Sequence, residues 1–265
     1  MNDPLAARYD LARHLAVEAG RLTLQYYRTG HAVERKQDGS PVTVADKGAE
    51  QLIRGRLAEQ YPEDGIVGEE FGITEGSSGY RWIIDPIDGT KSFISGVPLY
   101  GTMVAVEWEG RCQIGAIFFP PLNELIHARL GSGAWFGPPD GGHQPARVNQ
   151  TRRLADGLFL TSEVQTFRQR DAIGAYESLE RAAWLTRTWG DCYGYYLVAT
   201  GKAVAMVDPI LTVWDAAALQ PILVEAGGRF TDWRGTDSVE SGDGIGANPF
   251  VLDEVLAITA PYSPR

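Results

Sequence analysis

Cysteine is scarce in this 265-residue chain, which contains only Cys112 and Cys192. Two cysteines so far apart provide neither the paired spacing of a zinc motif nor the framework of a disulfide-stabilised scaffold. A chain of this length can bury a large core without such links. We therefore expect both residues to be reduced and buried, as is usual in a cytoplasmic protein.

Positive charge is also in short supply. The chain has 24 Lys and Arg residues against 34 Asp and Glu residues, which gives a formal net charge of -10. No long run of basic residues offsets this excess. Nucleic acids and anionic membranes attract basic surfaces, so the sequence argues against either as a partner.

Long hydrophobic runs are missing as well. No stretch of about 18 apolar residues occurs, so no transmembrane helix is expected. The N-terminal segment "MNDPLAARYDLARHLAVEAG" has early acidic residues and no uninterrupted apolar core, unlike a signal peptide. These absences predict a cytoplasmic protein.

Several motifs of other enzyme classes are absent. The 4 histidines form no HxH or HxxxH pattern, which argues against a histidine-rich metal-dependent phosphatase. No DxDxT run marks an aspartyl-phosphate phosphatase, and no GxGxxG or GxxxxGK[ST] loop marks a nucleotide site. The function must therefore be sought in other residues.

Hydrophobic periodicity predicts the elements of the first half. A long helix that ends near Gly30 is predicted from apolar residues at helical spacing: Leu11, Leu15, Ala19, Leu22 and Tyr26. A polar loop at 36–46 and a second helix through Ala49–Leu57 follow. Runs rich in β-branched and aromatic residues predict strands at 65–70, 80–85, 102–110, 111–120 and 124–131, with a hairpin between the third and fourth.

From residue 146 the pattern alternates between strands and helices. Strands are predicted at 156–162, 183–188, 202–208 and 229–233, and helices at 172–183, 192–201 and Trp214–Ala226. This alternation is typical of a layered α/β architecture. The loop "GPPDGGHQ" is the predicted junction between an N-terminal half, residues 1–142, and a C-terminal half, residues 143–265.

The stretch "WIIDPIDGTKSF", residues 82–93, places two aspartates at the end of an apolar run. Asp85 precedes a proline, which favours an extended backbone, and the chain is expected to turn at Gly89. Both carboxylates and the carbonyl of Ile87 can then face the same side, and such hard oxygen ligands suit Mg²⁺ or Ca²⁺. Taken alone, the stretch is equally consistent with a turn in which Asp85 and Asp88 accept hydrogen bonds from backbone amides.

Further acidic residues stand at the boundaries of predicted elements: Asp46 in "VTVAD", Glu69 and Glu70 in "GEE", and Asp215 in "WDAAA". Each one alone is more often a helix cap or a solvated charge. If Asp46, Glu69 and Asp215 converged on the aspartates of "DPID", repulsion and lost hydration would be prohibitive without cations. Convergence would therefore imply two or more divalent ions.

Gly89 and Thr90 begin the segment after the predicted turn. The Thr90 hydroxyl could orient a water molecule, and backbone amides near a helix N-terminus could hold a phosphate group. The alternative is a plain turn that enters a helix.

Taken in order, these motifs resemble the inositol monophosphatase superfamily of metal-dependent phosphatases. "VTVAD", "GEE", "DPIDGT" and "WDAAA" with "EAGG" follow the family's order and spacing over residues 36–228. The resemblance implies an αβαβα sandwich with metal ions between its two halves. It also implies Mg²⁺ as the cofactor, with two or three ions per active site, and a homodimer.

The resemblance implies a role for each matching residue. The metal ligands would be Glu69, Asp85, the Ile87 carbonyl, Asp88 and Asp215. The catalytic residues would be Asp46, which holds a further, weaker ion or its water, Glu70, which acts as a base or orients the water, and Thr90, which polarises the attacking water.

Two longer segments resemble the histidinol-phosphate phosphatase branch: "DPIDGTKSFISGVPLYGT" and "RTWGDCYGYYLVATGKAVAMVDPILTVWDAAALQPILVEAGG". Inositol phosphatases more often have Asn in place of Ser92, and a small apolar segment where this chain has "GDCYGYY". These departures suit histidinol phosphate, which carries an ammonium group and an imidazole group that can protonate near neutral pH.

Acidic and aromatic residues could recognise that cationic end. Asp191 and Asp208 can pair with positive charge, and Trp189, Tyr193 or Tyr195 can stack on it. Asp191 could instead cap the helix that follows it, and the tyrosines could instead belong to the core. The predicted substrate-binding set is completed by Gly89, Thr90 and Arg187.

The sequence therefore predicts a Mg²⁺-dependent phosphomonoesterase that hydrolyses L-histidinol phosphate to L-histidinol and phosphate in histidine biosynthesis. One alternative is an inositol-1-phosphate or broad sugar-phosphate phosphatase with the same metal site. Another is a regulatory module that keeps the fold without turnover, against which the complete acidic set argues.

Overall fold

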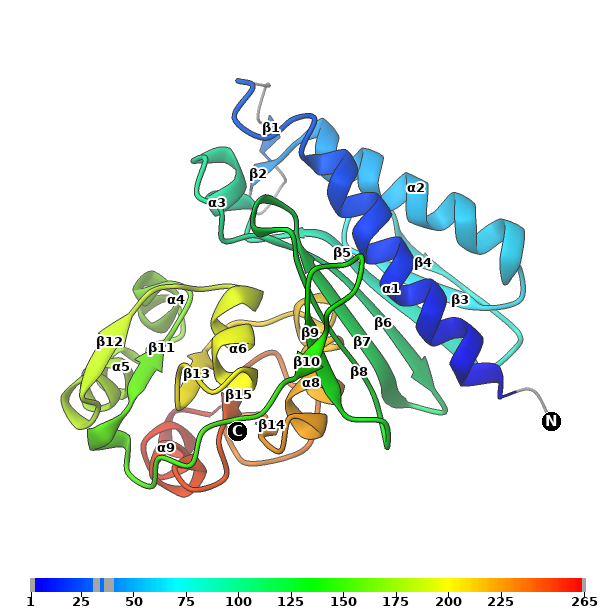
Figure 1. Cartoon of the computed structure of the whole chain (residues 1–265). Coiled ribbons are helices and arrows are strands. Elements are labelled where there is room, and N and C mark those ends of the chain that lie inside the picture. Colours follow the sequence, from blue (N-terminus) through cyan, green and yellow to red (C-terminus); the bar gives the residue numbers. More distant parts are fainter. Residues whose placement is uncertain (1–2, 31–33, 36–40, 264–265) are drawn as a thin grey trace.

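The structure, a computed structural model, describes residues 3–30, 34–35 and 41–263 (Figure 1). The first part of the predicted polar loop, residues 36–40, lies outside these ranges. The helices are α1 (Pro4–Thr23), α2 (Val44–Gln60), α3 (Thr90–Ile94), α4 (Val164–Gln169), α5 (Ile173–Ala182), α6 (Cys192–Ala199), α7 (Val213–Ala216), α8 (Leu219–Glu225) and α9 (Leu252–Thr259).

The strands form three sheets within the described residues. They are β1 (Glu34–Arg35), β2 (Pro41–Val42), β3 (Gly65–Gly68), β4 (Gly72–Thr74), β5 (Tyr80–Asp88), β6 (Gly101–Trp108), β7 (Arg111–Phe119), β8 (Glu124–Arg129), β9 (Ala134–Gly137), β10 (Gln144–Pro145), β11 (Leu158–Leu160), β12 (Leu185–Arg187), β13 (Ala205–Asp208), β14 (Arg229–Thr231) and β15 (Gly244–Ala247). An 8-stranded sheet has the order β10-β9-β8-β7-β6-β5-β3-β4, a 5-stranded sheet has the order β12-β11-β13-β15-β14, and β1 pairs with β2.

Side chains that alternate along the strands separate three cores. In β5, Trp82 and Ile84 pack with α1 and α2, while Ile83 packs with the layer of α6 and α8. In β11, Leu160 faces that same layer, while Phe159 packs with α4, α5 and α9. Successive residues of a strand point to opposite faces, and each of the two larger sheets has helices on both sides. The layers run α, β, α, β, α, which confirms the predicted αβαβα sandwich (Figure 1).

The single helix predicted over Trp214–Ala226 is wrong, because the structure has the two short helices α7 and α8 there. Pro221 lacks an N–H group and cannot donate to the carbonyl of Ala217, one turn earlier. The same break separates α7, whose Asp215 lines the cavity described below, from α8, which packs between the sheets.

The first helix is also shorter than predicted. It ends at Thr23, after which the chain forms turns, and Leu24 is already exposed. None of the helices in the described part of the chain is both long and apolar enough to cross a membrane.

The hairpin predicted between β6 and β7 is confirmed. Trp108 pairs with Arg111, and the two residues between them, Glu109 and Gly110, have φ angles of 51° and 77°. Two consecutive left-handed residues form the turn type whose twist matches the flanking strands. The sequence did not predict the short strands of two to four residues, which are β1, β2, β4, β9, β10 and β15.

The predicted boundary between residues 142 and 143 lies in the loop that joins β9 to β10. These two strands pair with each other, so both belong to the 8-stranded sheet. A boundary drawn by sheet membership falls between Pro145 and Leu158. The division into residues 1–142 and 143–265 stays a prediction.

One buried ion pair ties α1 to the neighbouring β5 region. The guanidinium carbon of Arg8 lies 4.3 Å from the ring centre of Tyr61 and 3.7 Å from that of Tyr80. Its Nε and Nη2 atoms each donate to the Asp64 carboxylate at 2.8 Å, and Trp82 Nε1 donates to it at 2.8 Å. Burial alone raises the pKa of Asp64, but these hydrogen bonds and the Arg8 charge outweigh it, so the pKa lies below its usual value.

Replacing Asp64 by alanine should lower the free energy of unfolding by about 3–5 kcal/mol, because the Arg8 charge stays buried without its partner. Urea denaturation at pH 7 would measure this loss. A carboxyl group with a lowered folded pKa stabilises the protein above its unfolded pKa, near 3.9, and this contribution is lost as the pH falls further. The difference in the free energy of unfolding between wild type and Asp64→Ala should therefore become smaller below about pH 4.

The exposed pair of Arg13 and Asp10 provides a matched control. Asp10→Ala should change the free energy of unfolding by less than about 0.5 kcal/mol. An Asp64→Ala variant no less stable than Asp10→Ala would contradict the role given to the buried pair.

Candidate active site

Asp85 and Asp88 lie at the end of β5, on either side of an irregularity in its pairing with β6. Pro86 has no N–H group for the ladder, and its carbonyl accepts a hydrogen bond from Thr102 Oγ1 at 2.8 Å. Gly89 follows with a φ of 86°, a conformation that favours glycine. The predicted turn is therefore confirmed, and both aspartates line one cavity.

Carboxylates from distant parts of the chain meet in this cavity. Oxygen atoms of Asp85, Asp88 and Asp215 all lie within 4.8 Å of one another, and Asp215 comes from α7 in the second half. Glu69, in the turn between β3 and β4, and Ile87 line the same cavity, which has a volume of about 570 Å³. The structure thus brings together all five predicted metal-ligating residues.

The electrostatic surroundings of Asp85 and Asp88 are unfavourable to their charged forms. No ion pair among the described residues includes Asp85 or Asp88. Burial raises the pKa of Asp85 well above its usual value, and the charges of Glu69, Asp88 and Asp215 raise it further. Burial, Asp191 and Asp215 do the same for Asp88. Each carboxylate destabilises the negative charge of its neighbours, and a bound cation would offset this repulsion.

Two helix caps hold carboxylates of the site in place. Asp46 Oδ2 accepts hydrogen bonds from Thr43 N at 2.8 Å and Thr43 Oγ1 at 2.6 Å. Asp215 Oδ2 accepts from Thr212 N and Thr212 Oγ1, both at 2.8 Å. Each aspartate is thus the N3 residue of a capping box. The same carboxylate can therefore serve in a helix cap and in the site.

Asp46 is not among the residues that line the cavity. Its pKa is raised chiefly by burial, and the nearby charge of Glu69 adds to the effect. Its Oδ1 atom is buried and has no hydrogen-bond partner among the described residues. A buried carboxylate oxygen without a donor is costly, and a further cation or its water would satisfy it.

The donor set fits a hard divalent cation. Carboxylate oxygens and one backbone carbonyl are ligands that Mg²⁺ accepts, and no thiolate or imidazole is needed. The carbonyl of Ile87 accepts a hydrogen bond from Thr90 Oγ1 at 3.0 Å, so both groups are at the turn. Thr90 and Gly89 line the cavity, as predicted for phosphate-binding residues.

Glu50, which the sequence did not single out, fixes the turn that carries Glu69 and Glu70. Its buried carboxylate accepts hydrogen bonds from the Glu70 backbone N–H at 2.7 Å and from Arg54 Nε at 2.7 Å. A Cβ atom on Gly68 would lie 2.0 Å from Glu50 Oε1, so only glycine fits there. The spacing of Glu50 and Arg54, one helical turn, was the available sequence signal. Glu70 itself is not among the residues that line the cavity.

Asp191 stands at the N-terminus of α6 but does not cap it. Its side chain makes no capping hydrogen bond; the first backbone N–H of α6, from Cys192, instead donates to Asp88. The alternative in which the Asp191 side chain serves as the cap is therefore wrong. Asp191 lines the cavity, and burial, followed by the charges of Asp208 and Asp215, raises its pKa to about 7.

Asp208 also lines the cavity, but its carboxylate is engaged by the protein. It accepts hydrogen bonds from the backbone and hydroxyl of Ser162, from the Thr161 hydroxyl and from the Tyr195 hydroxyl. Ser162 Oγ in turn accepts from the Asp191 N–H at 3.1 Å. Ser162 was not predicted, and it links the two aspartates assigned to the substrate.

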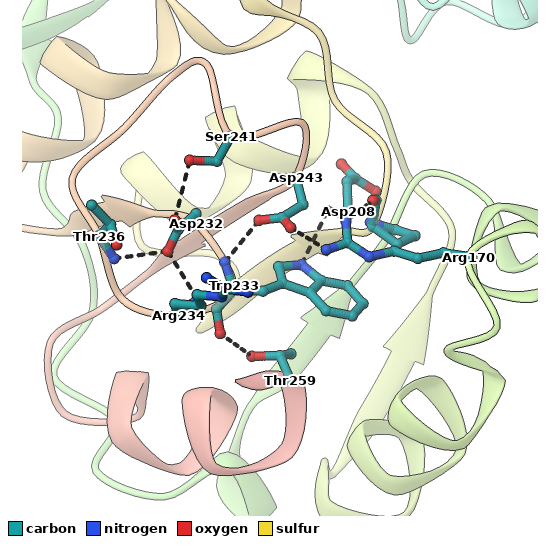
Figure 2. A network of polar contacts seen from close by, with 10 residues as sticks. Arg170, Asp208, Asp232, Trp233, Arg234, Thr236, Ser241, Asp243 and Thr259 are labelled. Atoms are coloured by element: carbon teal, nitrogen blue, oxygen red, sulfur yellow. Dashed lines mark hydrogen bonds and ion pairs between the residues drawn. The ribbon is translucent and has the colours of Figure 1, made fainter. Parts of the chain in front are cut away.

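A second network holds the backbone of Asp208 from the other side (Figure 2). Trp233 Nε1 donates to the Asp208 carbonyl at 3.1 Å, and Trp233 N donates to Asp243 at 2.8 Å. Arg170 pairs with Asp243 and lies 4.6 Å from the Trp233 ring centre. Asp208 is therefore held by its side chain and by its main chain.

Of the predicted aromatic residues, Trp189 presents an exposed ring to the cavity, with 44% of its surface accessible. Tyr195 is buried and donates to Asp208, while Tyr193 packs on Phe119 outside the cavity lining. Arg187 is likewise not among the cavity residues, and its guanidinium donates to the neighbouring carbonyl of Thr186. The substrate-binding role of Arg187 stays a prediction.

Comparisons with known proteins agree with this geometry. The model of the Inositol monophosphatase family matches residues 5–263. A histidinol-phosphatase from Chlorobaculum parvum is 45% identical over 236 residues, 89% of this chain and 89% of that protein. A histidinol-phosphatase from Streptomyces coelicolor is 37% identical over 93% of this chain and 94% of that protein. The solved structure of an inositol monophosphatase from Zymomonas mobilis has a TM-score of 0.84 and 30% identity, and the match covers 98% of this chain and 100% of that one.

Mg²⁺ should raise the unfolding temperature of the protein, because a bound cation relieves repulsion among the buried carboxylates. A cation at one hundred times its dissociation constant adds about 2.7 kcal/mol to the free energy of unfolding. Asp85→Asn should lose most of this gain. With a chelator present, however, the variant should unfold at the wild-type temperature or above, because one like charge is gone and Asn can still accept the hydrogen bond from Ile87 N.

Differential scanning calorimetry with EDTA and with Mg²⁺ would measure both effects, and Asp10→Asn, on the exposed side of α1, should keep the full Mg²⁺ gain. An unfolding temperature of the wild-type protein that is the same with EDTA and with Mg²⁺ would contradict the metal site.

Proposed function

Because the chain belongs to the inositol monophosphatase family, we propose that it is a Mg²⁺-dependent phosphomonoesterase that hydrolyses L-histidinol phosphate to L-histidinol and phosphate. The observation that carries the proposal is the meeting of the carboxylates of Asp85, Asp88 and Asp215 in one cavity. The similarity to two histidinol-phosphatases over nearly the whole chain supports the choice of substrate.

The residues that would hold Mg²⁺ are Glu69, Asp85, the Ile87 carbonyl, Asp88 and Asp215, with Asp46 for a further ion. We propose two or three ions per site. When bound, such ions neutralise charge on a phosphoryl group, activate a water nucleophile and stabilise the leaving alkoxide. Asp88 ends β5 of the 8-stranded sheet, whereas Asp215 lies in α7 of the second half. These residues would therefore hold the ions between the two halves.

Thr90 and Glu70 are the groups we propose for the water. Thr90 Oγ1 already donates its proton to the Ile87 carbonyl, so it can only accept a hydrogen bond from a water molecule in the cavity. A water held in this way keeps both of its lone pairs, one of which can face phosphorus. The hydrogen bond from the Glu70 N–H to Glu50 would fix the approach of Glu70 to the same region.

The cavity also contains groups that suit a cationic substrate. Asp191 faces it with a side chain that makes no cap, and Trp189 offers an exposed ring for stacking or a cation–π contact. Histidinol carries an ammonium group and an imidazole group, whereas inositol carries hydroxyl groups alone. Asp208 would act mainly by positioning Ser162, and through it Asp191.

The homodimer and the cytoplasmic location expected from the sequence remain predictions. All five proposed metal-ligating residues come from one chain, so this site needs no residue from a second copy.

The discriminating experiment measures phosphate release from L-histidinol phosphate and from inositol 1-phosphate, with Mg²⁺ and with a chelator. We expect release to require Mg²⁺. The value of kcat/KM should be at least roughly tenfold higher for histidinol phosphate, the worth of one hydrogen bond to a charged group.

A preference for inositol 1-phosphate would reassign the protein as an inositol or sugar-phosphate phosphatase. Release from neither ester with Mg²⁺ present would favour the regulatory module and would contradict the proposed enzyme.

A further inference from the structure

The cavity contains one positive side chain. Among the described residues that line it, Lys91 is the only lysine or arginine, while the acidic residues are Glu69, Asp85, Asp88, Glu163, Asp191, Asp208 and Asp215. Lys91 lies in α3, next to Thr90, and its ammonium group donates to the carboxylate of Glu163. Glu163 precedes α4 in the second half. The pair therefore bridges the two halves at the cavity.

The pair is open to water. The Lys91 side chain is 69% exposed and that of Glu163 is 36% exposed. Exposed ion pairs contribute little to stability, because water solvates both charges well and two long side chains must be ordered. A ligand with a positive group can therefore displace Lys91 from Glu163 at small cost.

Four of the other acidic residues of the cavity are engaged elsewhere. Asp85, Asp88 and Asp215 form the carboxylate cluster, and Asp208 accepts hydrogen bonds from Thr161, Ser162 and Tyr195. The partner of Glu163 is the ammonium group of an exposed lysine side chain instead of a backbone or ring donor. Glu163 is thus the acidic residue best able to exchange its partner.

Lys91 and Glu163 also lie close to the residue already proposed for the cationic end. Burial and the charges of Asp208 and Asp215 raise the pKa of Asp191, while Lys91 lowers it and Glu163 raises it by smaller amounts. Asp191, Glu163 and the exposed residue Trp189 therefore line the same cavity.

We propose that Glu163 binds the cationic tail of the phosphate ester, and that Lys91 occupies this carboxylate until the substrate replaces it. The displaced ammonium group of Lys91, one residue from Thr90, is then available to the phosphate dianion. A substrate with one anionic and one cationic end satisfies both members of the broken pair, whereas an ester with a neutral tail satisfies only Lys91. This inference rests on the proposed function and names the residue that selects the tail.

The test compares Glu163→Gln and Lys91→Gln with wild type on two esters at the same Mg²⁺ concentration: L-histidinol phosphate and glycerol 2-phosphate, whose tail is neutral. Glu163→Gln should raise KM for histidinol phosphate about tenfold or more, with KM for glycerol 2-phosphate and both kcat values within about twofold. Lys91→Gln breaks the same ion pair but keeps the carboxylate, so the ratio of kcat/KM for the two esters should not fall.

Binding of L-histidinol, which has no phosphate group, gives a readout that does not depend on turnover. Calorimetry should show weaker binding to Glu163→Gln and tighter binding to Lys91→Gln, because the second variant removes the competitor for Glu163. Glu59→Gln removes an exposed acidic residue of α2 that does not line the cavity, and it should leave both measurements unchanged.

Equal losses on both esters in Glu163→Gln, or weaker histidinol binding in both cavity variants, would make the pair structural and overturn the inference. An unchanged ester ratio in Glu163→Gln would overturn it as well while the proposed function stood. Wild-type protein that hydrolyses glycerol 2-phosphate but not histidinol phosphate would instead overturn the proposed function, and the inference with it.

Discussion

The mutual repulsion of buried carboxylates is the constraint on which the active-site region depends. Asp85, Asp88 and Asp215 offer oxygen atoms within 4.8 Å of one another, and burial denies them the solvation that would screen their charges. A folded chain accepts such an arrangement when a ligand offsets its cost. A divalent cation is the ligand that fits these oxygens.

The scaffold holds the carboxylates by using the ends of its helices. Asp46 and Asp215 each cap a helix with one oxygen, through the repeated pattern Thr-Val-x-Asp, so their backbone positions are fixed before any cation binds. Asp88 accepts the first N–H of α6, which ties the end of β5 to the second half. A helix N-terminus also stabilises a nearby negative charge. The same interactions that close the helices therefore preorganise the site.

Much of this could be predicted from the sequence, because its signals are local. The strand in which Ile83 and Ile84 point to opposite faces and the turn at Gly89 follow from short-range rules. The acidic motifs indicate the family by their order and spacing. What the sequence could not show is which distant groups meet. The burial of Glu50 against Gly68 and the pairing of Lys91 with Glu163 are contacts between separate elements. The break before Pro221 was a readable signal, but the hydrophobic periodicity of the segment concealed it.

A crystal structure with Mn²⁺ in place of Mg²⁺, with anomalous scattering measured at the manganese edge, tests the central claim most directly. The account predicts anomalous peaks between the carboxylates of Asp85, Asp88 and Asp215, at the roughly 2.0–2.2 Å separations of an oxygen-ligated cation. Asp215→Asn crystals should lose occupancy there while the fold is retained. A wild-type map at saturating Mn²⁺ with no peak among these three carboxylates would contradict the account.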